Sequence, residues 1–452
     1  MQRRIVLVIM AVALLVCTAC RAIPDTENTS TAPPSYITSS QMNESDTYSV
    51  GVTSSNPASS ETQTESVAKP EPEPEPSAPQ TEDEIRGVWI AFFELYPMFD
   101  GDFSSAFSAM LDKCVDSGFN AVYVHVRSHC DAFYESALFP WSGYCNKNGG
   151  VQGVNPGFDP LKIMVNLAHE RGLEFHAWIN PYRVSKDSTD LSLLADNNPA
   201  KIWLTDDIEE NDSNVTQWQG SLYLNPAEPE VQKLITDGVR EIVAGYGVDG
   251  IHFDDYFYPT TDAAFDETQY AAYRASVTSN PLALADWRRA NVNAMVASVY
   301  NAVKAERADC IFGISPMASI SNNYNTVYAD CAKWLEMGIV DYIMPQLYFG
   351  FKYSNAKSCF DKLLRDWCEL FKGKTQKLYI GLGSYRVGST AEGFTEWSES
   401  PDILLRQIEM LRQDGISDGF VIYSSTTFYK EDELSLAVRE SVENTIGNVA
   451  GE

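Results

Sequence analysis

Residues 249–259 read Asp-Gly-Ile-His-Phe-Asp-Asp-Tyr-Phe-Tyr-Pro, a short apolar run that ends in a dense group of polar and aromatic side chains. A short apolar run bounded by Gly and Pro is typical of a buried strand. A stretch of helical period, Pro229–Ala244, precedes it, and another, Trp287–Glu306, follows it. We therefore predict a strand at Asp249–Asp254, within a chain in which strands and helices alternate.

Seven further runs rich in Val, Ile, Tyr and Phe alternate with helical stretches in the same way. This alternation favours a parallel sheet, and eight such units favour closure into a (β/α)8 barrel, the TIM barrel. An open doubly wound sheet is the alternative, but no GxGxxG and no P-loop follows the first strand. The predicted strands are Arg86–Phe92, Asn120–Arg127, Glu174–Ile179, Asp249–Asp254, Cys310–Ser315, Asp341–Leu347, Lys377–Gly383 and Gly419–Ser424, and the remaining helices are Ser104–Ser117, Pro160–Arg171, Asn355–Phe371 and Asp402–Gln413.

Residues 1–20 have the layout of an export signal, because Arg3 and Arg4 precede an apolar run from Ile5 to Ala19. As a helix this run rises roughly 22 Å, which is short of the roughly 30 Å hydrocarbon core of a bilayer. Small residues stand just before Cys20, an arrangement that resembles a bacterial lipobox. We therefore predict a lipoprotein attached through Cys20 to the extracytoplasmic face of the cell membrane, with free secretion as the alternative.

Residues 21–83 are dominated by Ser, Thr, Pro, Glu and Gln, a composition that predicts a disordered linker. Residues 84–446 suffice for one barrel domain. The net charge of −29 makes nucleic acid an improbable partner. Cys130 and Cys145 share one loop, and the sequence leaves open whether they form a disulfide.

The working residues of such barrels lie at the mouth, by which we mean the C-terminal strand ends and the loops that follow them. Because strand side chains alternate between faces, His252, Asp254 and Tyr256 share one face, and Ile251, Phe253 and Asp255 share the other. We therefore predict that Asp254 faces the mouth as the main catalytic carboxylate, a nucleophile or base. Asp255 then supports Asp254 or contacts substrate, although strand twist can reverse the two roles.

Rings and polar groups gather at the other predicted strand ends. Aromatic rings stack on the apolar faces of sugars, while Asn, Arg and Gln side chains bind hydroxyl groups. The same alternation places His125 and Arg127 on one face of their strand, and His176, Trp178 and Asn180 on one face of theirs. The predicted substrate-binding groups are Trp89, Arg127, Trp178, Asn180, Tyr182, His252, Tyr256, Gln346 and Tyr348.

Glycoside hydrolysis ordinarily needs two carboxyl groups, one protonated and one ionised, on either side of the bond. Asp254 and Asp255 are expected to point to opposite sides, so the partner of Asp254 has to come from elsewhere. The strand ends from the fifth to the eighth carry no acid. The candidates are Asp131 and Glu135 in the loop after the second strand, and then Glu94 after the first.

A metal site is an alternative hypothesis, because three histidines are predicted to face the barrel interior: His125, His176 and His252. A metal-dependent hydrolase or deacetylase would use them as ligands. However, neither HxH nor HExxH is present, and buried strand histidines more often hydrogen-bond to neighbouring groups. We therefore predict neither a metal nor another cofactor.

The motifs together resemble the glycosyl hydrolase-like 10 family. The segments that carry the resemblance are Arg86-Gly-Val-Trp89, Ala177-Trp-Ile-Asn-Pro-Tyr-Arg183, Leu224-Asn-Pro226, Gly250-Ile-His-Phe-Asp-Asp-Tyr-Phe-Tyr-Pro259, Phe312-Gly-Ile-Ser-Pro316 and Asp341-Tyr-Ile-Met-Pro-Gln346. The second strand departs from the family pattern, because it ends Val126-Arg-Ser-His-Cys-Asp131 where the family has Val-(Arg/Lys)-Pro.

The resemblance implies a TIM barrel that acts on polysaccharide, including peptidoglycan glycan strands. It assigns site roles to Asp254, Asp255, Asn180, Tyr182, Arg183, Asn225 and Gln346. The leading hypothesis is therefore a membrane-attached glycosidase with Asp254 as its main catalytic carboxylate. A barrel that binds glycan without cleaving it is the alternative from another functional class, because no second acid is placed by the sequence.

Overall fold

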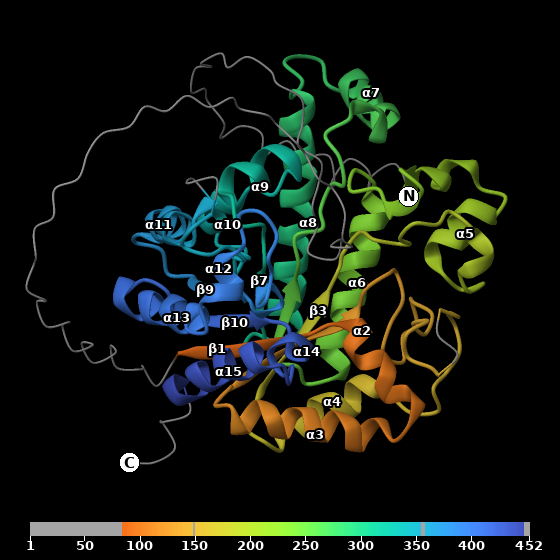
Figure 1. The fold of residues 1–452 in the computed structure, drawn as a ribbon. Coiled ribbons are helices and arrows are strands. Elements are labelled where there is room, and N and C mark those ends of the chain that lie inside the picture. Colours follow the sequence, from red (N-terminus) through yellow and green to blue (C-terminus); the bar gives the residue numbers. More distant parts are fainter. Residues whose placement is uncertain (1–83, 148–149, 354–357, 447–452) are drawn as a thin grey trace, which may run out of the picture. The chain divides into compact units, whose positions relative to one another are not determined.

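The computed structural model describes residues 84–147, 150–353 and 358–446 (Figure 1). The predicted signal segment, its Cys20 and the predicted linker at 21–83 lie outside these residues. Within the described ranges, no helix combines the length and apolarity needed to cross a bilayer. Cys130 and Cys145 are both buried free thiols.

Eight parallel strands close into a barrel in the order β1-β10-β9-β8-β7-β6-β3-β2. The predicted (β/α)8 barrel is thereby confirmed, and every predicted strand overlaps one of the eight. The barrel strands are β1 (Ile85–Ile90), β2 (Ala121–Arg127), β3 (Glu174–Ile179), β6 (Gly250–Phe253), β7 (Ile311–Ile314), β8 (Tyr342–Ile343), β9 (Lys377–Gly383) and β10 (Gly419–Tyr423). A small hairpin, β4 (Val215–Trp218) and β5 (Ser221–Leu224), is inserted between β3 and β6 and was not predicted.

Helices surround the strands of the barrel (Figure 1). The six predicted helices are present, and most of their ends lie within three residues of the prediction, whereas the helices at Glu267–Ser276 and Glu433–Ile446 were not predicted. The α-helices are α2 (Phe92–Leu95), α3 (Phe103–Asp116), α4 (Pro160–His169), α5 (Pro199–Thr205), α6 (Pro229–Gly245), α7 (Glu267–Ser276), α8 (Leu284–Glu306), α9 (Ile320–Thr326), α10 (Cys331–Met337), α11 (Phe360–Phe371), α12 (Glu396–Glu399), α13 (Ile403–Asp414), α14 (Ser425–Phe428) and α15 (Glu433–Ile446).

Some predicted element ends were wrong. Phe92 begins α2 instead of ending the first strand, and α11 begins at Phe360 instead of Asn355. β8, which was predicted as Asp341–Leu347, is only two residues long, because Pro345 has no N–H to donate to a neighbouring strand. These differences shorten elements without changing their order.

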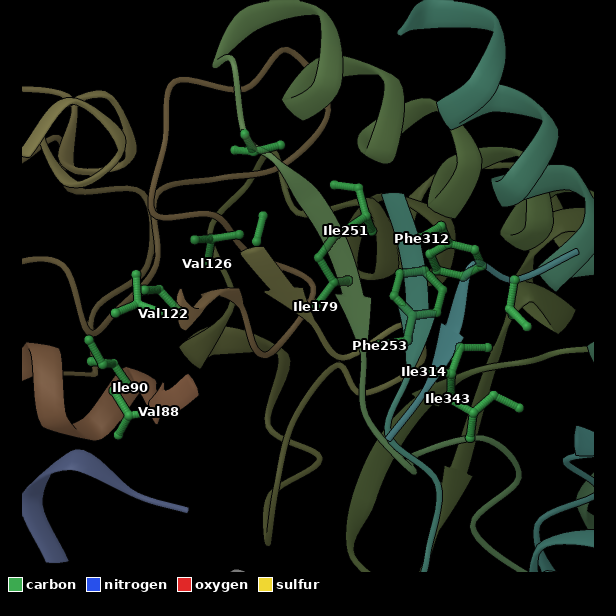
Figure 2. Close-up of a cluster of buried hydrophobic side chains, with 14 of the residues drawn as sticks. Val88, Ile90, Val122, Val126, Ile179, Ile251, Phe253, Phe312, Ile314 and Ile343 are labelled. Carbon is green, nitrogen blue, oxygen red and sulfur yellow. The ribbon is translucent and has the colours of Figure 1, made fainter. Parts of the chain in front are cut away.

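Two different cores pack on the two sides of the sheet. Aliphatic side chains such as Val88, Ile251 and Ile314 face outward toward the helices (Figure 2). The inward side instead carries large rings, among them Trp89, Tyr123 and Tyr342. The barrel interior is thus filled by aromatic and imidazole groups, which support the mouth from below.

Gly313 leaves room for one of these rings. A Cβ added to Gly313 on β7 would lie 2.2 Å from ring atoms of Tyr342 on the neighbouring strand. We expect Gly313→Ala to destabilise the fold by about 1–3 kcal/mol, because an added methyl group overpacks the barrel interior. Urea unfolding measures this change. Gly245→Ala is the control, because no atom lies within 4 Å of its added Cβ, and an unfolding free energy equal for both variants would contradict the prediction.

Candidate active site

Asp254 lies directly after β6, and its carboxyl group is buried. The indole N–H of Trp178 donates to its Oδ2 (3.0 Å), and the backbone N–H of Tyr256 donates to its Oδ1 (3.3 Å). Burial, with the neighbouring charge of Asp255, raises the pKa of Asp254 to about 7, although Trp178 and Arg183 oppose the shift. This carboxyl group can therefore hold a proton near neutral pH.

Asp255 belongs to the same site, against the expectation that it points to the other side. Because β6 ends at Phe253, strand alternation no longer applies at this position. Its charge acts on Tyr348, which belongs to the inward-facing core. Burial raises the pKa of Asp255, while a hydrogen bond from Gln346 and the charge of Arg183 oppose the shift.

Arg183 supplies the positive charge of the site. Its guanidinium lies 3.9 Å from the ring centroid of Tyr256, and its charge lowers the pKa values of both Asp254 and Asp255. The loop that carries Arg183 is held by Asn180, whose Oδ1 accepts the Arg183 backbone N–H (3.1 Å). The guanidinium therefore acts electrostatically on both carboxyl groups.

Gln346 links Asp255 to the segment that follows β7. Its Nε2 donates to the carbonyl oxygen of Ser315, which follows β7 (3.1 Å). The structure therefore brings seven of the fifteen predicted site residues together. These are Trp178, Arg183, Asp254, Asp255, Tyr256, Gln346 and Tyr348.

His252 is occupied by protein partners on both ring nitrogens. The indole N–H of Trp89 can only donate, so Nε2 of His252 accepts it (3.1 Å). The proton of His252 then lies on Nδ1, which donates to the Tyr342 hydroxyl (2.9 Å). Burial lowers the pKa of His252 well below its usual range, so the neutral ring supports the mouth from the barrel interior.

The other two inward histidines also pack within the barrel. His125 stacks on Trp178, with ring centroids 3.9 Å apart, and His176 stacks on Tyr123 at 4.3 Å. Across the part of the chain that the structure describes, no group of three or more His, Cys, Asp or Glu side chains is placed to hold a metal ion. His125 and His176 therefore serve as ring contacts in this arrangement.

Arg127 does not face the mouth, so its predicted face was wrong. A β-bulge between His125 and Arg127 reverses the alternation at the end of β2. The guanidinium packs 4.5 Å from the ring of Phe139 and against Gly238 of α6. Arg127 is therefore enclosed between the barrel and the helix layer, away from the predicted sugar-binding face.

Glu135 is not brought to the mouth either. Its side chain is exposed, and its carbonyl oxygen accepts the hydroxyl of Tyr246, which follows the C-terminal end of α6. That end of α6 leads to the start of β6, on the side opposite to the mouth. Glu135 therefore cannot be the second catalytic carboxyl group.

The remaining acid candidates hold loops in place. The Glu94 carboxylate accepts hydrogen bonds from the backbone N–H groups of Ala91 (2.5 Å) and Thr426 (2.7 Å), and from two serine hydroxyls. Asp131 accepts from the backbone N–H of His129 (3.2 Å) and from Gln152 (3.3 Å). Burial raises the pKa of Asp131 to about 6.

Three residues assigned by the resemblance are buried beside the mouth. The Nδ2 atoms of Asn180 and Asn225 and the hydroxyl of Tyr182 have no hydrogen-bond partner among the described residues. Tyr182 belongs to the outward-facing core and contacts Phe257, with ring centroids 6.5 Å apart. Its ring is thus packed against protein instead of lining the mouth as predicted.

Sequence reasoning did not select two tyrosines that the structure places at the site. Tyr423 contacts both Trp178 (6.4 Å) and Tyr348 (5.7 Å), and Tyr385 contacts Tyr348 (5.5 Å). Both stand at ends of predicted strands, so their position was the available signal. Their ring contacts depend on strand order around the closed barrel.

A (β/α)8 barrel whose mouth holds a buried and a half-buried carboxyl group among aromatic rings has the arrangement of a glycoside hydrolase. The model of the glycosyl hydrolase-like 10 family matches residues 84–399. The chain belongs to this family, as its motifs predicted, and is a glycosidase.

Curated relatives agree with this family membership. The chain is 35% identical over 369 residues to the glycosyl hydrolase YngK of Bacillus subtilis, covering 76% of this chain and 69% of that protein. It is 32% identical over 390 residues to the glycosyl hydrolase DigH of Escherichia coli K12, covering 79% of this chain and 85% of that protein.

Solved structures share the fold. One is the glycoside hydrolase domain of PgaB from Bordetella bronchiseptica, with a TM-score of 0.53 and 14% identity, covering 79% of this chain and 99% of that one. Another is the catalytic domain of β-amylase from Paenibacillus polymyxa, with a TM-score of 0.54 and 12% identity, covering 81% and 99%. At such identities the likeness shows the barrel fold alone.

Proposed function

We propose that this glycosidase cleaves glycan strands with Asp254 and Asp255 as its two catalytic carboxyl groups. The observation that carries the proposal is the raised pKa of Asp254, about 7, beside a second carboxyl group in the same mouth. Two neighbouring acids in a desolvated site titrate apart, so that one keeps its proton while the other is ionised. Glycoside hydrolysis requires one protonated and one ionised carboxyl group, which such a difference between the two pKa values provides.

Asp254 is the proton donor in this proposal, a change from the nucleophile or base expected from sequence. Its protonated carboxyl group gives a proton to the glycosidic oxygen, and the bond from that oxygen to the anomeric carbon breaks. Positive charge then develops on the sugar ring, and the carboxylate of Asp255 stabilises it until a water molecule adds to the anomeric carbon and returns a proton to Asp254. The hydrogen bond from Gln346 and the charge of Arg183 favour the ionised form of Asp255 against the effect of burial, while Trp178 orients Asp254 through its indole hydrogen bond.

The proposed substrate is the glycan strand of peptidoglycan. The family resemblance and the predicted export signal support this choice, because an exported glycosidase meets cell-wall glycan. In the same proposal, lipidation of Cys20 holds the enzyme at the extracytoplasmic face of the membrane, and the linker at 21–83 spaces the barrel from it.

Purified glycan strands without peptides test the function directly. We expect reducing ends to be released, and the rate to fall as the pH rises through about 7, because Asp254 then loses the proton that it donates. A reducing-end assay between pH 4 and 9 measures both. Cleavage of chitin or cellulose fragments but not of glycan strands would overturn the substrate, and a rate that rises through pH 7 would overturn the role of Asp254.

A further inference from the structure

Three half-buried rings form an aromatic shelf beside the proposed catalytic carboxyl groups. The shelf consists of Phe92 on α2, Tyr96 at the start of the next short helix, and Tyr144 in the loop after β2. The ring centroids of Phe92 and Tyr144 lie 4.6 Å apart, and those of Tyr96 and Tyr144 lie 6.1 Å apart. Both loops follow strand ends, so the shelf belongs to the mouth.

The shelf is connected to Asp254 by a continuous series of ring contacts. Phe92 contacts His125 edge to face (5.4 Å), and His125 stacks on Trp178 (3.9 Å). Trp178 in turn donates its hydrogen bond to Asp254. Two rings therefore separate the shelf from the catalytic carboxyl group, so a sugar on the shelf lies away from the cleaved bond.

The His129 imidazole and the Tyr144 hydroxyl are uncharged near neutral pH. His129 lies beneath it, 5.2 Å from Phe92 and 5.9 Å from Tyr144, and hydrogen-bonds through Nδ1 to the Ser128 hydroxyl (2.9 Å). Burial lowers the pKa of His129 to about 3, and burial raises the pKa of the Tyr144 hydroxyl. Flat rings with neutral polar edges suit the apolar face and hydroxyl groups of a pyranose.

The two buried acids that are not catalytic in this proposal hold the shelf in place. Glu94 fixes α2, and with it Phe92, to α14 through the backbone N–H of Thr426. Asp131 fixes the backbone of His129 and receives Gln152 from farther along the same loop. The shelf is thus supported from both loops before any ligand arrives, which reduces the ordering cost of binding.

We propose that Phe92, Tyr96 and Tyr144 form a second carbohydrate subsite, which holds a pyranose of the same glycan at least one sugar away from the bond cleaved at Asp254. The inference rests on the proposed glycosidase site and adds a requirement for chain length. A substrate long enough to reach the shelf gains stacking energy that a short one lacks.

Glycan-strand fragments of graded length test this subsite. For Tyr144→Leu we expect kcat/KM on the longest fragments to fall about tenfold through KM, because the flat ring is lost. On the shortest fragment that the wild-type enzyme cleaves, kcat/KM is expected to stay within about twofold, by the same contact argument. Tyr144→Phe keeps the ring and is expected to retain most of the length dependence.

Tyr300→Leu is the matched control, because Tyr300 is a half-buried tyrosine on α8 in the outer helix layer. Thermal unfolding checks that each variant is folded. Equal losses on short and long fragments, or no loss for folded Tyr144→Leu, would overturn the subsite. If the wild-type enzyme cleaves no glycan strand, the proposed substrate is wrong. Calorimetric binding of chito-oligosaccharides and cello-oligosaccharides of graded length then tests whether the shelf binds sugar. An affinity that rises with oligosaccharide length in the wild type but not in Tyr144→Leu supports the subsite. The same length dependence in the two proteins, or no length dependence in the wild type, overturns it.

Discussion

Asp254→Asn is expected to lower kcat on glycan strands by about 10²–10⁴-fold, because the amide has the shape of the carboxyl group but no acidic proton to donate. The affinity for the glycan is expected to change little, since Trp178 can still donate to the amide oxygen. Reducing-end release and calorimetric binding measure the two effects separately. Glu135→Gln is the control, and it is expected to keep full activity because its side chain lies outside the mouth.

The same substitution is expected to change stability in a pH-dependent way. The folded pKa of Asp254, about 7, lies above the ordinary value of 3.8, so its stabilising contribution is complete below 3.8 and is lost as the pH rises through 7. The free energy of unfolding falls by about 4 kcal/mol at most over this pH range. Asp254→Asn should therefore unfold at a higher temperature than the wild type at pH 8, by a margin that shrinks at pH 5. An unchanged kcat in Asp254→Asn would show that Asp254 is not the proton donor.

Asp266→Asn is expected to destabilise the fold by about 3–5 kcal/mol, because it leaves a buried guanidinium without its counterion. Arg288 and Asp266 are fully buried, and Nε of Arg288 donates to both carboxylate oxygens of Asp266 (3.1 and 3.0 Å). Arg288 also donates to the carbonyl oxygens of Thr260 (3.4 Å) and Asp262 (2.7 Å). The pair therefore fixes the loop that carries both proposed catalytic carboxyl groups.

Urea unfolding measures this loss, and the ion pair between Arg365 and Asp361 on α11 provides the comparison. That pair is solvent-exposed, with 68% of the Arg365 side chain accessible. Asp361→Asn is expected to cost less than about 1 kcal/mol, because exposed charges are already solvated. Similar losses for the two variants would show that the burial of Arg288 has little energetic effect.

The architecture could be predicted from sequence because it depends on local patterns. Apolar strand runs, helical periods and their order are properties of neighbouring residues, and eight repeats favour a closed barrel. Asp254 was found in the same way, from its place after the apolar run at 250–253. Its neighbours Trp178 and Gln346 were found because they follow strands whose ends meet at one mouth.

Only the tertiary structure decided which polar groups share the site. The early end of β6 turns Asp255 into the mouth, while the bulge in β2 turns Arg127 out of it. Neither is visible in a period-two pattern, because one extra residue or one missing strand position reverses the face of every later side chain. The raised pKa of Asp254 is likewise a property of burial among residues distant in sequence. The sequence by itself determined the barrel and pointed to Asp254, whereas packing placed Asp255 in the same site and raised the pKa of Asp254.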